Sequence, residues 1–443
     1  MKIIIEQFLS KTNNLDKLLI SLIFFFPLLL SISIFLADLF ASLTALIVIV
    51  LLILKKNKDI FYQIRFKLYF FLIFYFIILI SLIFSFSFEK SFLPSFFYFR
   101  YLLFALGIYY LLKKYTFFIN IFFYSLIFSF SIISFDSLVQ YIIGYNILGF
   151  KTGADPTPYI TSFFNDEKKL GSYLVRLLPL FISLFYFLNL KKFSNYIIFF
   201  IGFLIFLSSE RTAFFLYMTI LFFYFLVIKY KIKFLVICSI IFLLTFTFNE
   251  KLKYKYVNYT LKQLGFIETE WNQNYEGKKR YFSKEHEDLA LTAFTIFKDN
   301  YLNGSGIKTF HDACNLYKFN EEKSDINYLD YLNRNNKITC STHPHNTYLQ
   351  ILSEIGIFGF FLIFFFFLKT LYENIKIMFF SKKLTNIEMS YYFLNLGIII
   401  NLFPLIPSGN FFNNWLSLVM FYPLGYWFFI YQINTNRIED NDK

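Results

Sequence analysis

The chain has 443 residues, of which 57% are hydrophobic and 24% aromatic, while only 16% are charged. Soluble domains average roughly 45–50% apolar and about 25% charged residues, so this chain has more apolar side chains than a water-soluble core can bury. The composition indicates a membrane protein and excludes a cytosolic enzyme, a secreted disulfide scaffold and a nucleic-acid-binding domain, despite the formal charge of +13.

Long apolar runs occupy most of the chain. A hydrocarbon core of about 30 Å takes roughly 20 apolar residues of helix, and a helix is the spanning form open to such runs. The sequence therefore predicts an all-α polytopic membrane protein with about twelve transmembrane helices, near residues 18–36, 39–54, 68–87, 93–112, 116–135, 172–189, 196–208, 213–228, 233–248, 346–368, 390–406 and 412–431.

The basic residues are distributed unevenly between the short loops that join these runs. Cationic loops tend to stay in the cytoplasm. With the N-terminus inside, the inner loops hold most of the Lys and Arg residues, and the outer short loops hold only Lys90, Lys151, Lys168, Lys169 and Arg211. We therefore expect both termini in the cytoplasm. The first run is interpreted as a retained helix because no small-residue cleavage site follows it.

Two polar segments interrupt the apolar pattern, and this topology places both outside. One is an outer loop at 136–171. The other, 249–345, is a large loop between the ninth and tenth helices, and its 14 basic residues nearly balance its 13 acidic ones. The predicted organisation is therefore nine helices in 1–248, the large loop in 249–345, three helices in 346–431 and a cytoplasmic tail in 432–443.

All the histidines of the chain lie in the large loop or at its exit. They are His286, His311, His343 and His345. Two of the three cysteines, Cys314 and Cys340, lie in the same loop. An oxidising outer compartment would allow a disulfide between them that holds the loop near the histidines, and two free thiols are the alternative.

The segment Ser341-Thr342-His343-Pro344-His345-Asn346 leads into the tenth predicted helix. Pro344 favours an extended His343 and suits a first helical position, which would put His345 in the opening turn. There the positive end of the helix dipole should lower the pKa of His345 and keep its ring neutral, and the same amides would attract a phosphate. A general base beside an anion site is typical of a transferase.

Other interpretations of this region stay open. His-x-His with two further loop histidines could bind a metal through four nitrogens, although the spacing is not a zinc pattern. Alternatively, His343 and His345 only cap a helix and meet lipid headgroups. Asn346, Gln350 and Glu354 recur every four residues as one polar stripe, which serves either helix packing or a substrate cavity.

Arginines outside the inner loops are candidates for binding a phosphate. Arg211 lies in the short outer turn 208–212, where a guanidinium could hold a pyrophosphate bidentately or reach lipid phosphate. Arg280 and Arg334 are the arginines of the large loop, and spacing does not choose between them.

Two further arginines, Arg100 and Arg176, fall inside predicted helices near their outer ends. A charge at that depth needs a partner or a water-filled groove. Asp166 and Glu167, just before the sixth helix, are possible partners, and an ion pair here could be structural or functional.

These residues resemble those of a known family. His345-Asn346, nine residues, Gly356, two residues and Gly359 are similar to the His-Asn-x9-Gly-x-x-Gly signature of the O-antigen ligase and O-antigen polymerase superfamily. Further similar blocks are Phe163-Phe164-Asn165-Asp166-Glu167-Lys168 with Gly171-Ser172-Tyr173-Leu174, Ser209-Glu210-Arg211-Thr212-Ala213, and Lys298-Asp299-Asn300 through Gly304-Ser305-Gly306 and Phe310. About twelve helices with one large outer loop before the signature are also this family's architecture.

The resemblance implies a GT-C-like fold in the bacterial inner membrane with a periplasmic active site. It implies a metal-independent, inverting glycosyltransferase without cofactors. The donor would be a glycan on a polyprenyl pyrophosphate such as undecaprenyl pyrophosphate, and the acceptor a hydroxyl of lipid A core or of a glycan.

The resemblance also implies site residues. His345 matches the family's catalytic histidine. Where the family has a second loop arginine, this sequence has His286, with Arg280 six residues earlier. The expected substrate-binding residues are Arg211, Arg280, His343, Asn346, Arg176 and His286.

Three functions are consistent with these features. The first is a ligase that joins finished O-antigen to lipid A core in lipopolysaccharide biosynthesis. The second is a polysaccharide polymerase that joins repeat units, or a related protein glycosylation transferase, with the same site and another acceptor. The third is a polyprenyl-glycan flippase or other transporter, for which inverted repeats with broken helices near the bilayer midplane would be expected.

Overall fold

The computed structural model describes residues 2–54, 58–154, 158–228, 232–267, 282–319, 338–380 and 384–441. Over these residues the chain is largely helical and forms no strand, and two isolated bridges join Tyr145 to Lys151 and Gly153 to Tyr159. The predicted all-α fold is confirmed.

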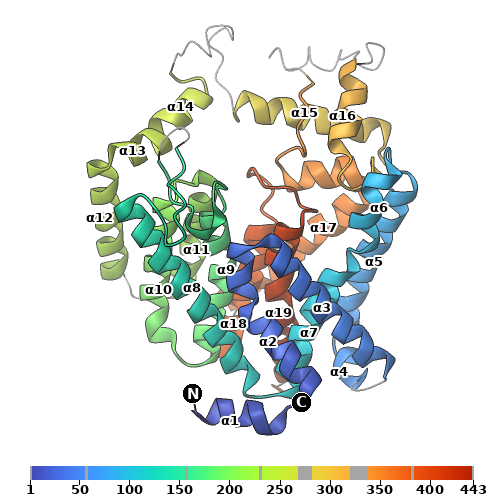
Figure 1. Cartoon of the computed structure of the whole chain (residues 1–443), viewed down its shortest axis with the longest axis vertical. Helices are drawn as coiled ribbons and strands as arrows, with labels where there is room; N and C mark the ends of the chain where they lie inside the picture. The colour runs from blue at the N-terminus through green and yellow to red at the C-terminus, as the bar shows by residue number, and fades with distance from the viewer. Residues whose placement is uncertain are drawn as a thin grey trace.

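Helices cover most of each predicted apolar run, and further helices form outside these runs (Figure 1). Those of the first half are α1 (Lys2–Lys11), α2 (Asn14–Ile32), α3 (Ile34–Ile53), α4 (Lys58–Tyr62), α5 (Arg65–Ile83), α6 (Phe88–Phe96), α7 (Phe99–Lys114), α8 (Phe118–Ile143), α9 (Leu170–Phe187), α10 (Ser194–Leu207) and α11 (Arg211–Val227). The others are α12 (Ile232–Phe248), α13 (Glu250–Lys253), α14 (Tyr259–Gln263), α15 (Lys284–Asp299), α16 (Phe310–Phe319), α17 (Thr347–Phe380), α18 (Asn386–Asn401) and α19 (Asn414–Asn441).

Eight stretches of the described residues are long and apolar enough to cross a membrane. They are Asn14–Ile32, Ile34–Ile53, Arg65–Ile83, Phe88–Lys114, Phe118–Ile143, Leu170–Phe187, Thr347–Phe379 and Asn414–Asn436. The other predicted runs coincide with the shorter helices α10, α11, α12 and α18. The chain is therefore a multi-pass membrane protein, and the number of twelve spans stays a prediction.

Helix α8 continues to Ile143, so residues 136–143, which we expected in an outer loop, are helical. Two buried polar residues account for the difference. Asp136 accepts hydrogen bonds from the Ile147 amide at 2.8 Å and from Ser162 Oγ at 2.5 Å, and Gln140 Oε1 accepts one from the Thr161 amide at 2.7 Å. These side chains face a folded segment that satisfies them, whereas polarity alone suggested that they were in water.

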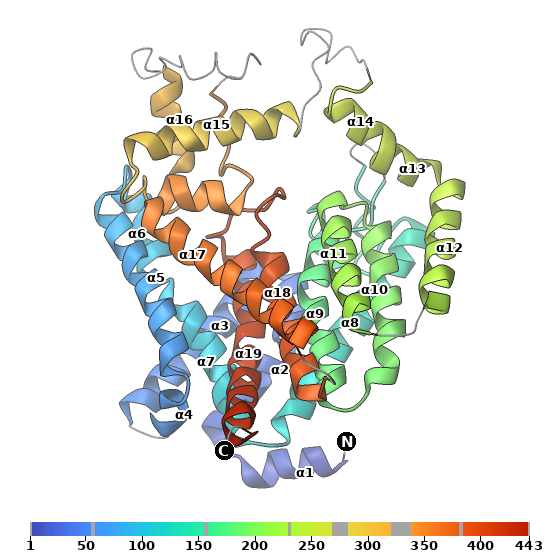
Figure 2. The same ribbon diagram turned by 180° about the vertical axis from the view of Figure 1, so that it is seen from behind.

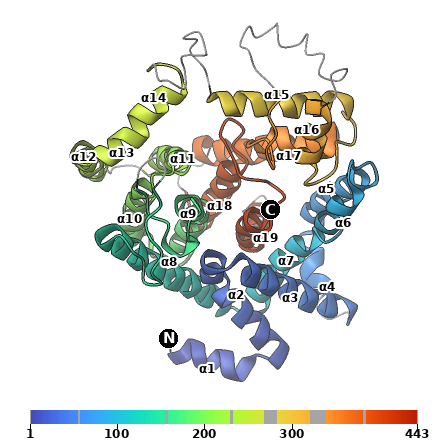
Figure 3. The same cartoon turned by 45° about the horizontal axis from the view of Figure 1, so that its top comes forward.

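Three helices, α9, α18 and α19, lie inside the ring formed by the others (Figure 3). Nearly every residue of α9 is buried, and α9 packs against α18, which in turn packs against α19. Small polar groups join these helices: Ser183 Oγ and Ser390 Oγ are 2.6 Å apart, and Trp427 Nε1 donates to Asn395 Oδ1 at 2.7 Å. Such pairs satisfy polar groups that lipid cannot.

The two termini lie at one end of the molecule, and α15 and α16 lie at the opposite end (Figures 1 and 2). At the end with the termini, the buried carboxylate of Asp16 on α2 accepts hydrogen bonds from Lys114 Nζ and Tyr115 Oη, each at 2.6 Å. This ion pair ties α2 to the end of α7 on the side that we predict to be cytoplasmic.

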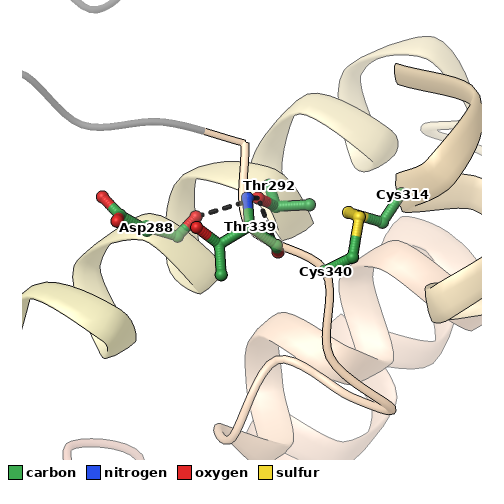
Figure 4. Close-up of a disulfide and its surroundings, with 5 residues drawn as sticks. All are labelled: Asp288, Thr292, Cys314, Thr339 and Cys340. Carbon is green, nitrogen blue, oxygen red and sulfur yellow. Dashed lines mark hydrogen bonds between the residues drawn. A yellow bond between two sulfur atoms is a disulfide. The ribbon is translucent and has the colours of Figure 1, made fainter. Parts of the chain in front are cut away.

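The described parts of the large loop have a small apolar core of their own. Leu289, Ala293 and Ile296 of α15 pack with Phe310 and Ala313 of α16. Cys314 and Cys340 form a disulfide beside this core (Figure 4), with their Cα atoms 5.6 Å apart.

Next to the disulfide, the residues that precede the histidine segment Ser341–Asn346 contact α15. Thr339 N donates to Thr292 Oγ1 at 3.1 Å, and Thr292 Oγ1 also lies 2.9 Å from the Asp288 carbonyl (Figure 4). The disulfide and this contact together bring residues 338–346 down from α15 and α16 to the start of α17.

Candidate active site

Helix α17 begins after Asn346 and not at Pro344. Asn346 Oδ1 accepts hydrogen bonds from the amides of Tyr348 at 3.0 Å and Leu349 at 3.1 Å, and the Asn346 carbonyl accepts one from Gln350 at 2.9 Å. These are the bonds of an N-cap residue. The prediction that His345 lies in the opening turn is therefore wrong, because the asparagine cap starts the helix beyond it. Asn346 also occupies the two amides that we expected to attract a phosphate.

The backbone of His345 is held from the other side by the segment between α18 and α19, residues 402–413. His345 has a positive φ of 53°, a conformation in which histidine is enriched among non-glycine residues. Its carbonyl accepts a hydrogen bond from the Ser408 amide at 2.8 Å, and Asn346 Nδ2 donates to the Pro404 carbonyl at 2.8 Å. Hydrogen bonds to the α18–α19 segment therefore fix the backbone from which the His345 imidazole extends.

A kink in α17 fixes the helix start relative to α15. Gly356 has φ 76° and ψ −171°, a conformation that is essentially restricted to glycine. The turn that follows α15 binds this kink through backbone hydrogen bonds: Ile357 N donates to the Tyr301 carbonyl at 2.9 Å, and Gly306 N donates to the Glu354 carbonyl at 2.9 Å.

Neither backbone leaves room for a side chain at this contact. A Cβ on Gly356 would lie 2.1 Å from the Leu302 carbonyl oxygen, and a Cβ on Gly304 would lie 2.3 Å from the carbonyl carbon of Glu354. A glycine of the signature and a glycine of the upstream block therefore each pack against the backbone of the other segment. Their contact sets the distance between α15, which carries His286, and the turn that carries His345.

Three imidazoles gather at this point. The ring centroids of His343 and His345 are 4.1 Å apart, and those of His286 and His345 are 5.7 Å apart. Thr342 Oγ1 lies 2.9 Å from His343 Nδ1, and Ser283 Oγ is hydrogen-bonded to His286 Nδ1. His345 makes no hydrogen bond through its ring with any residue that the structure describes, and His311 lies exposed on α16.

The environment favours the neutral form of all three rings. Burial lowers the pKa of His345, and the nearby Glu285 carboxylate opposes this by raising it. Burial and then the charge of His345 lower the pKa of His286, and the same two causes lower the pKa of His343 to about 4. The predicted direction for His345 is the one found, although burial and not the helix dipole is its main cause.

Arg211 is the first residue of α11 and reaches toward α14. Its Nη1 donates to Thr260 Oγ1 and its Nη2 donates to Gln263 Oε1, each at 2.7 Å, and its guanidinium lies 5.1 Å from the Tyr259 ring centroid. Arg211 is also near enough to His286 for its charge to lower the pKa of that imidazole. The structure thus brings together an arginine and histidines that are far apart in the sequence.

The turn that presents Arg211 is tied to α9 by Glu210. The Glu210 carboxylate accepts hydrogen bonds from the amides of Gly171 at 2.6 Å and Ser172 at 3.0 Å. Arg176, one turn further along α9, is buried and donates to Ser172 Oγ at 3.2 Å and to Asn401 Oδ1. The charges of Arg176 and Glu210 attract each other.

The partners that we suggested for the two membrane arginines are wrong. Arg100 forms an ion pair with Asp38 on α3, with Nη2 and Oδ1 3.0 Å apart, and Arg176 has Glu210 as its acidic neighbour. Glu167 pairs instead with Lys169. Both true partners are distant in the sequence, so proximity along the chain was a poor guide.

The polar stripe along α17 packs against the α18–α19 segment. Gln350 Nε2 donates to Glu354 Oε2 and to Asn410 Oδ1, each at 2.9 Å, and Gln350 Oε1 accepts from the Phe411 amide at 2.8 Å. Together with the helix cap at Asn346, these contacts favour a role of the polar stripe in helix packing.

Two predicted residues, Arg280 and Arg334, lie outside the described residues. Among the residues that are described, no group of three or more His, Cys, Asp or Glu side chains is arranged to hold a metal ion.

Sequence reasoning missed the residues that support the candidate site. Thr260 and Gln263, which bind Arg211, lie three residues apart on one face of α14, and Glu285 precedes His286 on α15. Their positions next to charged or aromatic neighbours were visible, but no motif distinguished them from other polar residues of the loop.

One comparison with known proteins supports the resemblance found in the sequence. Residues 196–364 match the family model described as O-antigen ligase. This range begins in α10, contains Arg211 and the three clustered histidines, and ends in α17 beyond Gly359. The search of curated proteins finds no match to the chain.

Proposed function

Because the chain belongs to the O-antigen ligase and polymerase superfamily, we propose that it is a glycosyltransferase of the ligase type. Its donor is a glycan carried by a polyprenyl pyrophosphate such as undecaprenyl pyrophosphate, and its acceptor is a hydroxyl of lipid A core. The protein lies in the bacterial inner membrane with both termini in the cytoplasm, and transfer takes place on the periplasmic face.

One observation carries this proposal. His345 is half-buried, its pKa is lowered, and its ring has no hydrogen-bond partner among the described residues. It lies in one cluster with His286, and the charge of Arg211 lowers the pKa of His286. A neutral imidazole can accept a proton, and a guanidinium can bind a pyrophosphate bidentately. A glycosyl transfer from a pyrophosphate needs both groups at one place.

The reaction is a single displacement at the anomeric carbon. The acceptor oxygen forms a bond to that carbon while the bond from the carbon to the pyrophosphate oxygen breaks, and the polyprenyl pyrophosphate leaves with the electron pair. His345 takes the proton of the acceptor hydroxyl. Attack from the face opposite the leaving group inverts the anomeric configuration, and the step requires no metal or cofactor.

Arg211 compensates the negative charge that develops on the leaving pyrophosphate. Electrostatic stabilisation of this kind is usually the largest contribution to catalysis, and base assistance adds roughly 10²- to 10⁴-fold. Hydrogen bonds to Thr260 and Gln263 orient the guanidinium. We propose that Arg280 of the large loop supplies the second cation.

The remaining predicted residues have supporting roles in this proposal. Asn346 positions His345 through the helix cap, and His343 and His286 line the acceptor side of the imidazole. Arg176 acts through Glu210, which anchors the turn that bears Arg211.

The test uses a deletion strain of the source bacterium complemented with wild-type protein, His345→Ala or His311→Ala. Lipopolysaccharide is resolved on gels, and the glycans bound to the polyprenyl carrier are extracted and sized. His311, which is exposed on α16, provides the matched control. We expect wild type and His311→Ala to restore the lipopolysaccharide ladder, and His345→Ala to lack the ladder and accumulate long chains on the carrier.

Other results would contradict this proposal in different ways. A core that carries one repeat unit in the deletion strain would identify a polymerase, and unchanged lipopolysaccharide with loss of a glycoprotein would identify a protein glycosylation transferase. If the deletion changes the glycans and His345→Ala does not, His345 is structural and the transporter becomes the better hypothesis.

A further inference from the structure

A groove with a charged end is lined by residues other than the clustered histidines. It is a groove of about 650 Å³ between α3 and the α6–α7 pair. Most of its wall is apolar, and several of these side chains are exposed, including Leu46 at 56% and Leu93 at 60%. Its apolar lining includes Leu39, Leu43, Leu46, Ile49, Leu93 and Phe97.

The charged end of the groove carries an excess of positive charge. Arg100 is neutralised by Asp38, whose carboxylate also accepts a hydrogen bond from Asn414 Nδ2 at 3.1 Å. Lys308 lines the same end and forms no ion pair with a described residue. Its charge is repelled by Arg100 and attracted by the carboxylates of Glu354 and Asp38. Two cations, Arg100 and Lys308, and one carboxylate, Asp38, line this end, so it keeps a net positive charge. An apolar groove with a cationic end is complementary to an acyl lipid with a phosphate at its head.

One short segment links this groove to the candidate active site. The α18–α19 segment contacts His345 through Ser408, contacts α17 through Asn410, and ends where Asn414 begins α19 in the groove. Arg211, by contrast, lies with α11 and α14 on the opposite flank of the molecule from α5 and α6 (Figures 1 and 2). Arg211 and the helix pair α5–α6 therefore lie on opposite flanks, and the α18–α19 segment connects the groove to the backbone of His345.

We propose that the α3–α6–α7 groove binds the lipid portion of the acceptor, an acylated and phosphorylated glycolipid. Its acyl chains lie along the apolar wall, its phosphate meets Lys308 and Arg100, and its sugar head extends over the α18–α19 segment to His345. This assignment rests on the proposed function, because it names the lipid whose hydroxyl is activated there.

The test measures binding separately from transfer. Full-length His345→Ala protein in phosphatidylcholine nanodiscs is titrated with fluorescent rough lipopolysaccharide, which is acylated and phosphorylated and carries core sugars without O-antigen. The groove variants are Leu46→Trp and Lys308→Gln. Their matched controls are Leu72→Trp, a similarly exposed leucine of α5 outside the groove, and Lys90→Gln, an exposed lysine paired with Asp312.

We expect Leu46→Trp and Lys308→Gln each to weaken binding about tenfold, since each removes a shape or charge contact of that order, and the controls to bind like the parent. Dephosphorylated lipid should bind more weakly and should be insensitive to Lys308→Gln. Equal binding by groove variants and controls would overturn the assignment. So would displacement by phosphatidylglycerol at equal mole fraction, because the groove would then hold bulk anionic lipid.

The same variants with an intact His345 separate the two proposals. In transfer assays Leu46→Trp should raise KM for the acceptor lipid and leave KM for the donor unchanged. If wild-type protein transfers no glycan but binding still depends on Leu46 and Lys308, the proposed function fails, and the groove is a glycolipid-binding site whose ligand is not an acceptor. If transfer occurs with no effect of the groove variants on acceptor KM, the groove assignment fails alone.

Discussion

The His345 ring combines a lowered pKa with nitrogens that form no hydrogen bond with any described residue. Burial disfavours the imidazolium, so the ring is in its base form at neutral pH. Its backbone is held by Ser408 and its neighbour Asn346 is held by the helix it caps. Position and protonation are thus set by different contacts, and each can be altered without the other.

This separation predicts the pH dependence of transfer. The neutral ring is the active form, so activity falls as pH falls through the lowered pKa of His345, and stays level from the ordinary histidine value of about 6.5 upward. Glu285→Gln removes the carboxylate that raises the pKa of His345, so the acid limb should move to lower pH. The measurement is kcat/KM against pH at low salt. A limb that moves to higher pH would contradict this assignment of the base.

Arg211 should be sensitive to shape as well as charge. Arg211→Gln should reduce kcat/KM by roughly 10²- to 10³-fold, as removal of a transition-state donor does elsewhere, and Arg211→Lys should fall between it and wild type because it keeps the charge and loses the fork. The control is Lys151→Gln, an exposed cation of another outer segment. Equal activity of Arg211→Gln and the control would remove Arg211 from the mechanism.

At the scale of elements, the kink in α17 is the feature that joins the loop to the membrane helices. Gly356→Ala should lower the stability of the contact by about 2–4 kcal/mol, because the side chain is both strained at φ 76° and overlapped by the Leu302 carbonyl. Gly397→Ala on α18 is the control, since its Cβ would lie no closer than 3.4 Å to any neighbouring atom, the nearest being Pro179 Cβ. Thermal unfolding in detergent measures both, and equal melting temperatures would show that the backbone contact contributes little.

The disulfide should order the path from α16 to the histidines. Cys314 and Cys340 are separated by 26 residues, and closing a loop of that size stabilises by about 3–4 kcal/mol in the chain-entropy account. Cys314→Ser with Cys340→Ser should therefore raise hydrogen exchange in residues 338–346 and lower transfer. Cys238→Ser, in the ninth predicted helix, is the control. Unchanged exchange at residues 338–346 would mean that the packing of α15 on α17 suffices.

Prediction from sequence succeeded where the signal was local and failed where it depended on tertiary contacts. Hydropathy located each long helix because lipid demands a continuous apolar stretch. The hydropathy pattern ended the fifth predicted helix at residue 135, whereas α8 continues to Ile143. The pattern missed this because the hydrogen-bond partners of Asp136 and Gln140 lie on a later segment. The cap at Asn346 and the Asp38 partner of Arg100 likewise depend on groups that only the fold brings near.

For the molecule as a whole, the separation of the termini from α15 and α16 predicts labelling from one side only. In a Cys238→Ser background, Lys90→Cys on α6 should react with an impermeant thiol reagent added to intact spheroplasts. Lys192→Cys, between α9 and α10, should react only after permeabilisation. Both lysines are exposed, so access and not burial decides the result. Labelling of Lys192→Cys from outside would reverse the proposed orientation.

The contact between the turn at 300–306 and the kink at Gly356 is made through main-chain hydrogen bonds, and it requires glycine at positions 304, 306 and 356. Selection for a new sugar or acceptor can then act on the side chains of the large loop without displacing His345. In a library randomised over the described loop positions, variants with altered glycan preference should keep Gly304, Gly306 and Gly356. This main-chain contact therefore allows the side chains of the large loop to change while the position of His345 is kept.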